Sequence, residues 1–541
     1  MYFDENTTVL IIEDSLTVRQ SLRTMLSMAG ITRSDAVSSA AEGRARLKGR
    51  RFDVVLCDYN LGDGMDGQEL LEALRKTGTL PLSTIWIMIT GERKYERVVA
   101  AAEMAPDDYI LKPFNSNLLL ARMNSAHRRK SFLAPAHEHL EKGNRSAAIS
   151  TLQQLAAAAP GPMNRIDANR LCAELLVTEG RQGEALHIYQ ALLESKVIPW
   201  AKMGVARIQA DQGMQGESSE LLREIIQDAP LYTDAYDLLA QNLIDEGQYT
   251  QAVDVLEKAV NISPRNFHRL KSCGTAALRS GDPEKGAQYL QRAVEIGRNN
   301  NFFGPEVLVD LLQAYSETGN TQYIDRLQAD ISASLAERPE AQFTLLTCKA
   351  LTALVQQRAE EALMQLKQAA DDLLKSFVNF ESVQRFLGAV VRLPETLIEA
   401  ELLESWTRTI TMRFAYSRHE LAMLLEIARK HARCSELIEH AYAELQEQSN
   451  KAVELTTEGR AAEAGRMLHE MAMRLYNERT GMNACAILLR VREQLRKKNQ
   501  DTSEYDQMLR EMLDWLPRDN ERVQGLLSRL HDQDGAEARS S

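Results

Sequence analysis

The chain has 541 residues, of which 44% are hydrophobic and 26% are charged. A chain of this length corresponds to about three to five domains. Its composition is typical of globular proteins and excludes global disorder. The net charge is −12, but residues 1–130 hold 18 Lys and Arg against 17 Asp and Glu, so the remaining residues carry −13. An acidic body argues against nonspecific nucleic-acid binding.

The patterns of apolar residues, N-terminal charges and cysteines indicate the cellular compartment. No apolar run approaches the roughly 18 residues of a membrane span, and the first ten residues carry acidic but no basic side chains, unlike a secretory signal. The six cysteines are scattered and contain no CxxC pair, which argues against a disulfide framework or a zinc site. We therefore expect a cytoplasmic protein.

The first 125 residues alternate short apolar runs with amphipathic stretches. The runs are rich in β-branched residues and predict buried parallel strands at residues 8–12, 33–38, 52–57, 84–89 and 109–111. The amphipathic stretches predict helices at residues 15–29, 40–48, 68–76, 92–104 and 117–130. Strands alternating with helices predict an α/β doubly wound domain with a five-stranded parallel sheet.

Polar residues stand where these strands end. Glu13 and Asp14 follow the first strand, Asp58 ends the third, Thr90 the fourth, and Lys112 follows the fifth. Ligands of open parallel sheets bind at this edge. Three carboxylates there need a cation, and oxygen ligands suit Mg²⁺. A metal-bound carboxylate can form an aspartyl phosphate, while the lysine and the hydroxyl contact phosphoryl oxygens.

Four motifs occupy these strand ends in order, namely IIEDS (11–15), LCDYN (56–60), MITGE (88–92) and YILKPF (109–114). Together they resemble the receiver domain of bacterial two-component response regulators over about residues 7–128. The resemblance implies that Asp58 is the phosphoacceptor. It also implies a Mg²⁺ site made by Glu13, Asp14, Asp58 and the backbone carbonyl of Asn60.

The same resemblance assigns the surrounding residues. Thr90 and Tyr109 match the switch pair of the family, and Lys112 matches its characteristic lysine, with a cis bond to Pro113. Asn60 and Glu92 flank the phosphate site, where they influence the loss of the phosphoryl group. We hypothesise a short-lived phosphoryl state.

One loop departs from the pattern of the family. Gly62 stands where the family usually has a proline, and Gly67 lies nine residues after Asp58 instead of eight, so the loop carries one extra residue. Its path, and any contact that a partner makes with it, therefore cannot be carried over. Asp63 and Asp66 are alternative phosphoacceptors that fall beyond the strand end.

A second period begins after residue 130. Glycines recur at positions 143, 180, 213, 247 and 281, a spacing near 34 that indicates helix–turn–helix repeats. In residues 233–266 the pattern of Ala240, Gly247, Ala252 and Pro264 predicts two close helices. This unit resembles a tetratricopeptide repeat (TPR), with Tyr236 where the family often has Trp. Four or five repeats are expected within residues 135–300.

The period weakens beyond residue 300 although helical patterns continue. We therefore expect four regions: a receiver domain at 1–130, TPR-like repeats at 131–300, a divergent helical-repeat region at 301–530, and a flexible tail at 531–541. The concave face of such a solenoid is the expected protein-binding surface.

The resulting interpretation is a response regulator, phosphorylated on Asp58 by a histidine kinase or a phosphotransfer protein, with TPR-type protein binding as its output. The receiver could also pair with a second receiver. It would be no enzyme beyond its own phosphorylation and dephosphorylation. Two alternatives remain: the C-terminal helices form a catalytic effector such as a phosphatase, or the chain contacts nucleic acid through basic runs such as residues 490–498.

Overall fold

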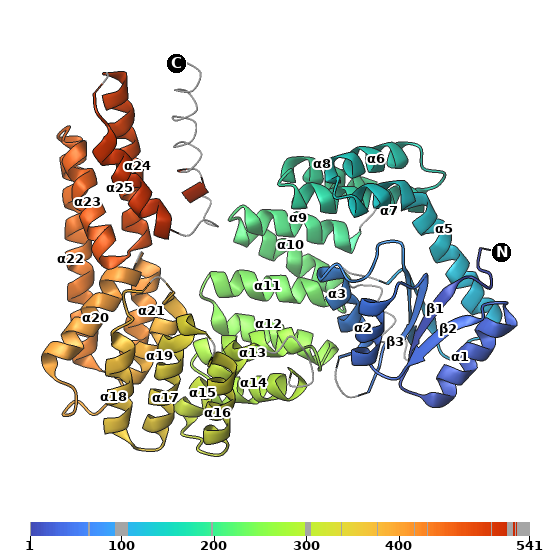
Figure 1. Cartoon of the computed structure of the whole chain (residues 1–541), viewed down its shortest axis with the longest axis horizontal. Helices are drawn as coiled ribbons and strands as arrows, with labels where there is room; N and C mark the ends of the chain where they lie inside the picture. Colours follow the sequence, from blue (N-terminus) through green and yellow to red (C-terminus); the bar gives the residue numbers. More distant parts are fainter. Residues whose placement is uncertain are drawn as a thin grey trace. The chain divides into compact units, whose positions relative to one another are not determined.

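The computed structural model describes residues 2–62, 65–91, 106–195, 198–297, 304–336, 338–375, 377–415, 417–429, 431–498, 500–516, 523, 524 and 526. The chain divides into two compact units, Met1–Leu311 and Leu312–Ser541. Figure 1 shows a sheet followed by helices throughout. No helix among the described residues is long and apolar enough to cross a membrane.

The first unit begins with the predicted five-stranded sheet. Its strands are β1 (Thr8–Ile12), β2 (Arg33–Val37), β3 (Val54–Asp58), β4 (Ile85–Thr90) and β5 (Asp108–Leu111). All pairs are parallel, in the order β2-β1-β3-β4-β5. The order reverses direction between β1 and β3, which confirms the doubly wound fold class.

Helices cover both faces of the sheet. The described ones are α1 (Leu16–Met28), α2 (Ala40–Gly49), α3 (Gly67–Lys76) and α5 (Ser116–Glu141). Because successive strand residues point to opposite faces, Leu10 and Trp86 join the core under α2 and α3, whereas Ile11 and Ile87 join the core under α1 and α5. The helix predicted at residues 92–104 lies outside the described residues.

Helix α5 serves both parts of the first unit. It runs for 26 residues, through residue 130 and with Pro135 inside it. Its first half packs on the sheet, where Met123 is fully buried. Near its end, Ala136 packs in one core cluster with Ile149 and Leu152 of the next helix. The last helix of the sheet domain is therefore also the first helix of the repeat stack.

Antiparallel helices then continue the unit: α6 (Arg145–Ala157), α7 (Pro162–Thr178), α8 (Gln182–Ser195), α9 (Pro199–Asp211), α10 (Gln215–Asp228), α11 (Thr233–Asp245), α12 (Tyr249–Ile262), α13 (Phe267–Arg279), α14 (Pro283–Gly297) and α15 (Pro305–Thr318), within which the division falls. The five periodic glycines all have φ between +73° and +84°. This left-handed conformation ends a helix and favours glycine, so the glycine period marks the repeat turns as predicted.

The second unit is entirely helical where it is described. Its elements are α16 (Ile324–Leu335), η1 (Pro339–Ala341), α17 (Gln342–Val355), α18 (Ala359–Ala370), α19 (Phe380–Val390), α20 (Ala400–Phe414), α21 (Arg418–Ala428), α22 (Ala432–Thr457), α23 (Ala461–Leu475), α24 (Glu478–Lys497) and α25 (Ser503–Trp515). Helix lengths here range from 11 to 26 residues, which explains why the period of about 34 fades. Residues 531–541 lie outside the described chain.

Candidate functional site

The parallel sheet gathers the predicted polar residues at its carboxyl edge. Glu13 and Asp14 directly follow β1, and Asp58 ends the adjacent β3. One ligand oxygen from each carboxylate lies within 4.8 Å of the others. Glu13 and Asp58 are buried and Asp14 is exposed. Three carboxylates so close together, one of them open to solvent, form an oxygen-only donor set that fits a hydrated divalent cation.

Lys112 joins the two buried carboxylates. Its Nζ atom donates to Glu13 Oε2 at 2.8 Å and to Asp58 Oδ2 at 2.9 Å. Its position depends on β4, because the backbone N–H of Lys112 donates to the carbonyl oxygen of Thr90 at 2.8 Å. The Lys112–Pro113 bond is cis, as the sequence predicts. One ammonium against three carboxylates leaves the site anionic.

Burial governs the protonation of this cluster. It raises the pKa of Glu13 to about 7, with the Lys112 hydrogen bond opposing and the Asp58 charge adding to the increase. Burial also raises the pKa of Asp58, again against Lys112. For Lys112 itself, burial lowers the pKa, but the bonds to Glu13 and Asp58 outweigh it and the net change is upward. Burial thus disfavours the ionised forms of Glu13 and Asp58, and additional positive charge nearby would stabilise them.

The loop that departs from the family pattern closes tightly on the site. The N–H of Gly67 donates to the Tyr59 carbonyl at 2.8 Å, and a Cβ on Gly67 would lie 2.2 Å from the Asp58 carbonyl oxygen. Asn60 is exposed, and its Oδ1 accepts a long bond of 3.4 Å from the Gly62 N–H. Asn60 therefore lies at the open side of the site.

Of the two alternative acceptors, Asp66 has a structural contact of its own. It is the N-cap of α3, and its Oδ1 accepts a hydrogen bond from the Glu69 N–H at 2.8 Å. In return, the Asp66 N–H donates to Glu69 Oε2 at 3.0 Å. This capping box satisfies two N–H groups of the helix end. Asp63 and the flanking Glu92 lie outside the described residues.

The predicted switch pair lies on neighbouring strands. Thr90 is buried at the end of β4, and Tyr109 pairs with Met88 across β4 and β5. The Tyr109 ring is half-buried against the core under α2 and α3, with the Arg122 guanidinium 5.9 Å from its centroid. Thr90 is therefore buried at the carboxyl edge of the sheet, whereas the Tyr109 ring is only half-buried on the face of the sheet that α2 and α3 cover.

Sequence reasoning missed a contact between the sheet domain and the repeats. Arg265, between α12 and α13, donates from Nη1 to the carbonyl oxygen of Gly62 at 2.6 Å. The two residues are 203 positions apart. The sequence around Arg265 does not indicate which residue this arginine contacts. At Gly62, the only unusual sequence feature is the extra residue in the loop after β3.

Comparisons with known proteins agree with this geometry. The model of the response regulator receiver domain matches residues 9–124, and a tetratricopeptide repeat model matches residues 233–266. The chain is 30% identical over 121 residues to the chemotaxis protein CheY-3 of Vibrio cholerae, which covers 22% of this chain and 92% of that protein. It is 34% identical over 125 residues to the KDP operon transcriptional regulatory protein KdpE of Escherichia coli, covering 23% of this chain and 53% of that protein.

Among solved structures, a CheY-like receiver domain from Methanospirillum hungatei is 30% identical and covers 23% of this chain and 96% of its own, with a TM-score of 0.21. The receiver model matches within the first quarter of the chain, and the match to CheY-3 includes nearly all of that protein's sequence. Through residues 9–124 the chain belongs to the response regulator receiver family, and it continues into tetratricopeptide repeats.

Proposed function

We propose that Asp58 accepts a phosphoryl group from the phosphohistidine of a sensor kinase or a phosphotransfer protein, and that this modification controls protein binding by the helical repeats. The observation that carries the proposal is the pair of bonds from Lys112 to the buried carboxylates of Glu13 and Asp58. A partly buried lysine beside carboxylates whose pKa values are raised suits an anionic group that arrives and leaves.

The transfer uses residues that the fold already holds in place. A carboxylate oxygen of Asp58 forms the new O–P bond while the P–N bond of the phosphohistidine breaks. Lys112 offers its charge to a phosphoryl oxygen, and the hydroxyl of Thr90 offers a hydrogen bond. Mg²⁺ bound by Glu13, Asp14, Asp58 and the Asn60 carbonyl would supply further positive charge. Water later hydrolyses the acyl phosphate and restores Asp58.

The output in this proposal is binding and not catalysis. The receiver performs only its own phosphorylation and dephosphorylation, Thr90 and Tyr109 respond to the phosphoryl group, and the repeats take a protein partner or bring two receivers together. All six cysteines are buried and unpaired, which supports a reducing cytoplasm as the place of action.

A small-molecule phosphodonor tests the acceptor directly. We expect acetyl phosphate with Mg²⁺ to add one phosphoryl group to the full chain, detected by intact-protein mass spectrometry, and Asp58→Asn to abolish it. Asp66→Asn is the matched control, because Asn can still cap α3. A phosphoryl group that persists in Asp58→Asn and disappears in Asp66→Asn would overturn the assignment.

A second experiment tests the output. The full chain is used to capture partners from lysate with and without Mg²⁺ and beryllofluoride, a mimic of the aspartyl phosphate. We expect recovery of one protein to change with the mimic in the wild type and to stay constant in Asp58→Asn. Equal recovery under all conditions would contradict phosphorylation-controlled binding.

A further inference from the structure

The loop between β1 and α1 supplies two of the three carboxylates of the cluster, and one residue of α1 holds its backbone. Arg19 is half-buried, and its Nη1 atom donates to the carbonyl oxygen of Asp14 at 2.9 Å and also to the carbonyl oxygen of Glu13. The backbone N–H of Arg19 donates to the carbonyl oxygen of Ser15 at 3.0 Å. Residue 19 therefore binds three consecutive carbonyl groups of this loop.

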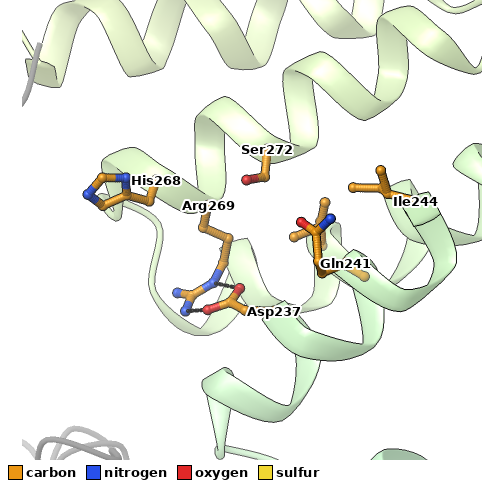
Figure 2. A pocket seen from close by; sticks show the side chains of 8 residues that line it. Asp237, Gln241, Ile244, His268, Arg269 and Ser272 are labelled. Atoms are coloured by element: carbon orange, nitrogen blue, oxygen red, sulfur yellow. Dashed lines mark hydrogen bonds and ion pairs between the residues drawn. The ribbon is translucent and has the colours of Figure 1, made fainter. Parts of the chain in front are cut away.

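These contacts differ from the usual pairing of an arginine with a carboxylate. Arg269 shows that pairing with Asp237, at 2.8 Å from Nε to Oδ1 and 2.6 Å from Nη2 to Oδ2, in the wall of a recess of about 200 Å³ between α11, α12 and α13 (Figure 2). A bidentate pair of this kind occupies both oxygens of the carboxylate. The bonds of Arg19 go to backbone carbonyls instead, so they leave the carboxylate oxygens of Glu13 and Asp14 to other partners.

The bond to the Asp14 carbonyl also sets the direction of the next N–H group. A peptide unit is planar and almost always trans, so its N–H points away from its carbonyl oxygen. Because Arg19 holds the Asp14 carbonyl on one side of the loop, the N–H of Ser15 in the same peptide unit faces the other side. There it donates to Glu13 Oε1 at 3.3 Å.

This N–H has a specific task because the Glu13 side chain is only 1% exposed. A buried carboxylate needs hydrogen-bond donors for its oxygens. Lys112 Nζ supplies Oε2 at 2.8 Å, and the Ser15 N–H supplies Oε1. Burial raises the pKa of Glu13, whereas both of these hydrogen bonds lower it. The two donors therefore fix the orientation of the carboxylate and favour the ionised form, which is the form that binds a cation.

We propose that Arg19 is a positioning residue, which orients the Glu13 carboxylate for Mg²⁺ by holding the peptide unit that follows Asp14. The inference rests on the proposed function, because it concerns the cation that phosphorylation of Asp58 would use. Arg19 acts through the backbone alone and contributes no ligand. Its loss should therefore affect the cation site without removing any of the carboxylates.

Position and charge make opposite predictions for this arginine. A guanidinium near a cation site repels the cation, so removal of its charge alone should tighten the binding of Mg²⁺. Loss of positioning should weaken the binding instead. We expect Arg19→Gln to bind Mg²⁺ about tenfold more weakly than wild type, measured by isothermal titration calorimetry of the full chain. Arg23→Gln is the matched control, because Arg23 lies one turn further along α1 and is exposed.

Ser15 allows a test at the other end of the same peptide unit. Its φ of −78° suits proline, and its side chain makes no capping bond to α1. Ser15→Pro removes the N–H, whereas Ser15→Ala keeps it, so we expect Ser15→Pro to bind Mg²⁺ about tenfold more weakly than Ser15→Ala. Arg19→Gln should cause no further loss in the Ser15→Pro background, because both substitutions act through one hydrogen bond. This comparison of Pro with Ala also decides the matter if Arg19→Gln does not fold.

Hydrogen–deuterium exchange without Mg²⁺ gives a readout that is independent of phosphorylation. The Ser15 N–H should exchange about fivefold faster in Arg19→Gln than in wild type or Arg23→Gln. Unchanged exchange would overturn the proposal, as would Mg²⁺ binding in Arg19→Gln that equals or exceeds that of wild type, or additive losses in the double variant.

The wild type separates this proposal from the proposed function. A wild type that binds Mg²⁺ but accepts no phosphoryl group from acetyl phosphate would overturn the proposed function and leave the role of Arg19 in cation binding intact. A wild type that binds no Mg²⁺ would overturn both.

Discussion

Gly67 packs directly on Asp58: a Cβ at Gly67 would lie 2.2 Å from the Asp58 carbonyl oxygen and 3.0 Å from the Cys57 and Met88 sulfur atoms. The first residue of α3 therefore touches the backbone of the phosphoacceptor itself. This contact fixes the distance between the end of β3 and the start of α3, whatever the number of residues in the loop between them.

The first prediction concerns this contact. Gly67→Ala places a Cβ against the Asp58 carbonyl oxygen, so the start of α3 must move away from the end of β3. The substitution should lower the free energy of unfolding of the receiver by about 1–3 kcal/mol. Scanning calorimetry of the full chain measures it. Gly49→Ala is the control, because a Cβ there meets nothing within 4 Å and alanine suits a helix end better than glycine. Equal effects of both substitutions would contradict the close contact.

The second prediction concerns Lys112. Lys112→Gln leaves the carboxylates of Glu13 and Asp58 without their ammonium, which should cost about 2 kcal/mol of unfolding free energy in the absence of Mg²⁺. A divalent cation should then raise the thermal midpoint more in this variant than in wild type, since it replaces the lost charge. Lys48→Gln, on the exposed side of α2, should leave both quantities unchanged. No gain from Mg²⁺ in Lys112→Gln would speak against a cation site.

The third prediction is a pH dependence at His137 in α5. Burial lowers the pKa of this histidine from 6.5 to about 4, with Lys130 adding to the decrease and Asp107 opposing it. The folded chain thus keeps His137 neutral while the unfolded chain protonates it near pH 6.5. Its contribution is complete above that pH and is lost as the pH falls from 6.5 toward 4, by about 1 kcal/mol between pH 7.5 and 5.5.

His137→Gln should remove the contribution of His137 to the decrease in unfolding free energy between pH 7.5 and 5.5. The difference between the thermal midpoints at these two pH values measures that decrease. His187→Gln, at an exposed position of α8, controls for the removal of a histidine. A pH dependence that is identical in wild type and His137→Gln would show that His137 does not become protonated on unfolding in this range.

The fourth prediction concerns the second unit. Arg413 is 4% exposed, and its guanidinium donates to the carbonyl oxygens of Leu373, Lys375 (2.7 Å) and Val378 (3.2 Å). It thereby holds the segment between α18 and α19. Arg413→Met leaves these carbonyls without a donor and should cost about 2–5 kcal/mol of unfolding free energy.

Calorimetry of the full chain should show this loss in one transition, with phosphorylation of Asp58 unaffected. Arg429→Met is the control, because the pair of Arg429 with Glu426 is largely exposed and such pairs contribute about 0–1 kcal/mol. Comparable losses in the two variants would contradict the structural role of Arg413.

The sheet and its carboxylate cluster could be predicted because both depend on local signals. Buried parallel strands appear as short apolar runs, and parallel pairing brings Glu13 and Asp58 together without any knowledge of side-chain packing. The repeat turns were equally accessible, since Gly247 and its equivalents need a left-handed φ that the sequence announces with glycine.

What escaped prediction depends on distant contacts. Nothing near Gly62 shows that its carbonyl oxygen accepts a hydrogen bond from Arg265, because the two residues are 203 positions apart in the sequence. The end of α5 escaped too: the expected helix stops at residue 130, but Ala136 is buried against α6 and extends it to Glu141.

The shared helix α5 constrains how this protein could arise or be re-engineered. A receiver excised together with the whole of α5 would remove Ala136 from the core that contains Ile149 and Leu152, whereas a cut at residue 130 would divide the helix in two. Recombination that exchanges the receiver therefore finds no junction within α5, or directly after it, that preserves the packing of the helix on both the sheet and α6, so the receiver and the first repeats are inherited as one unit.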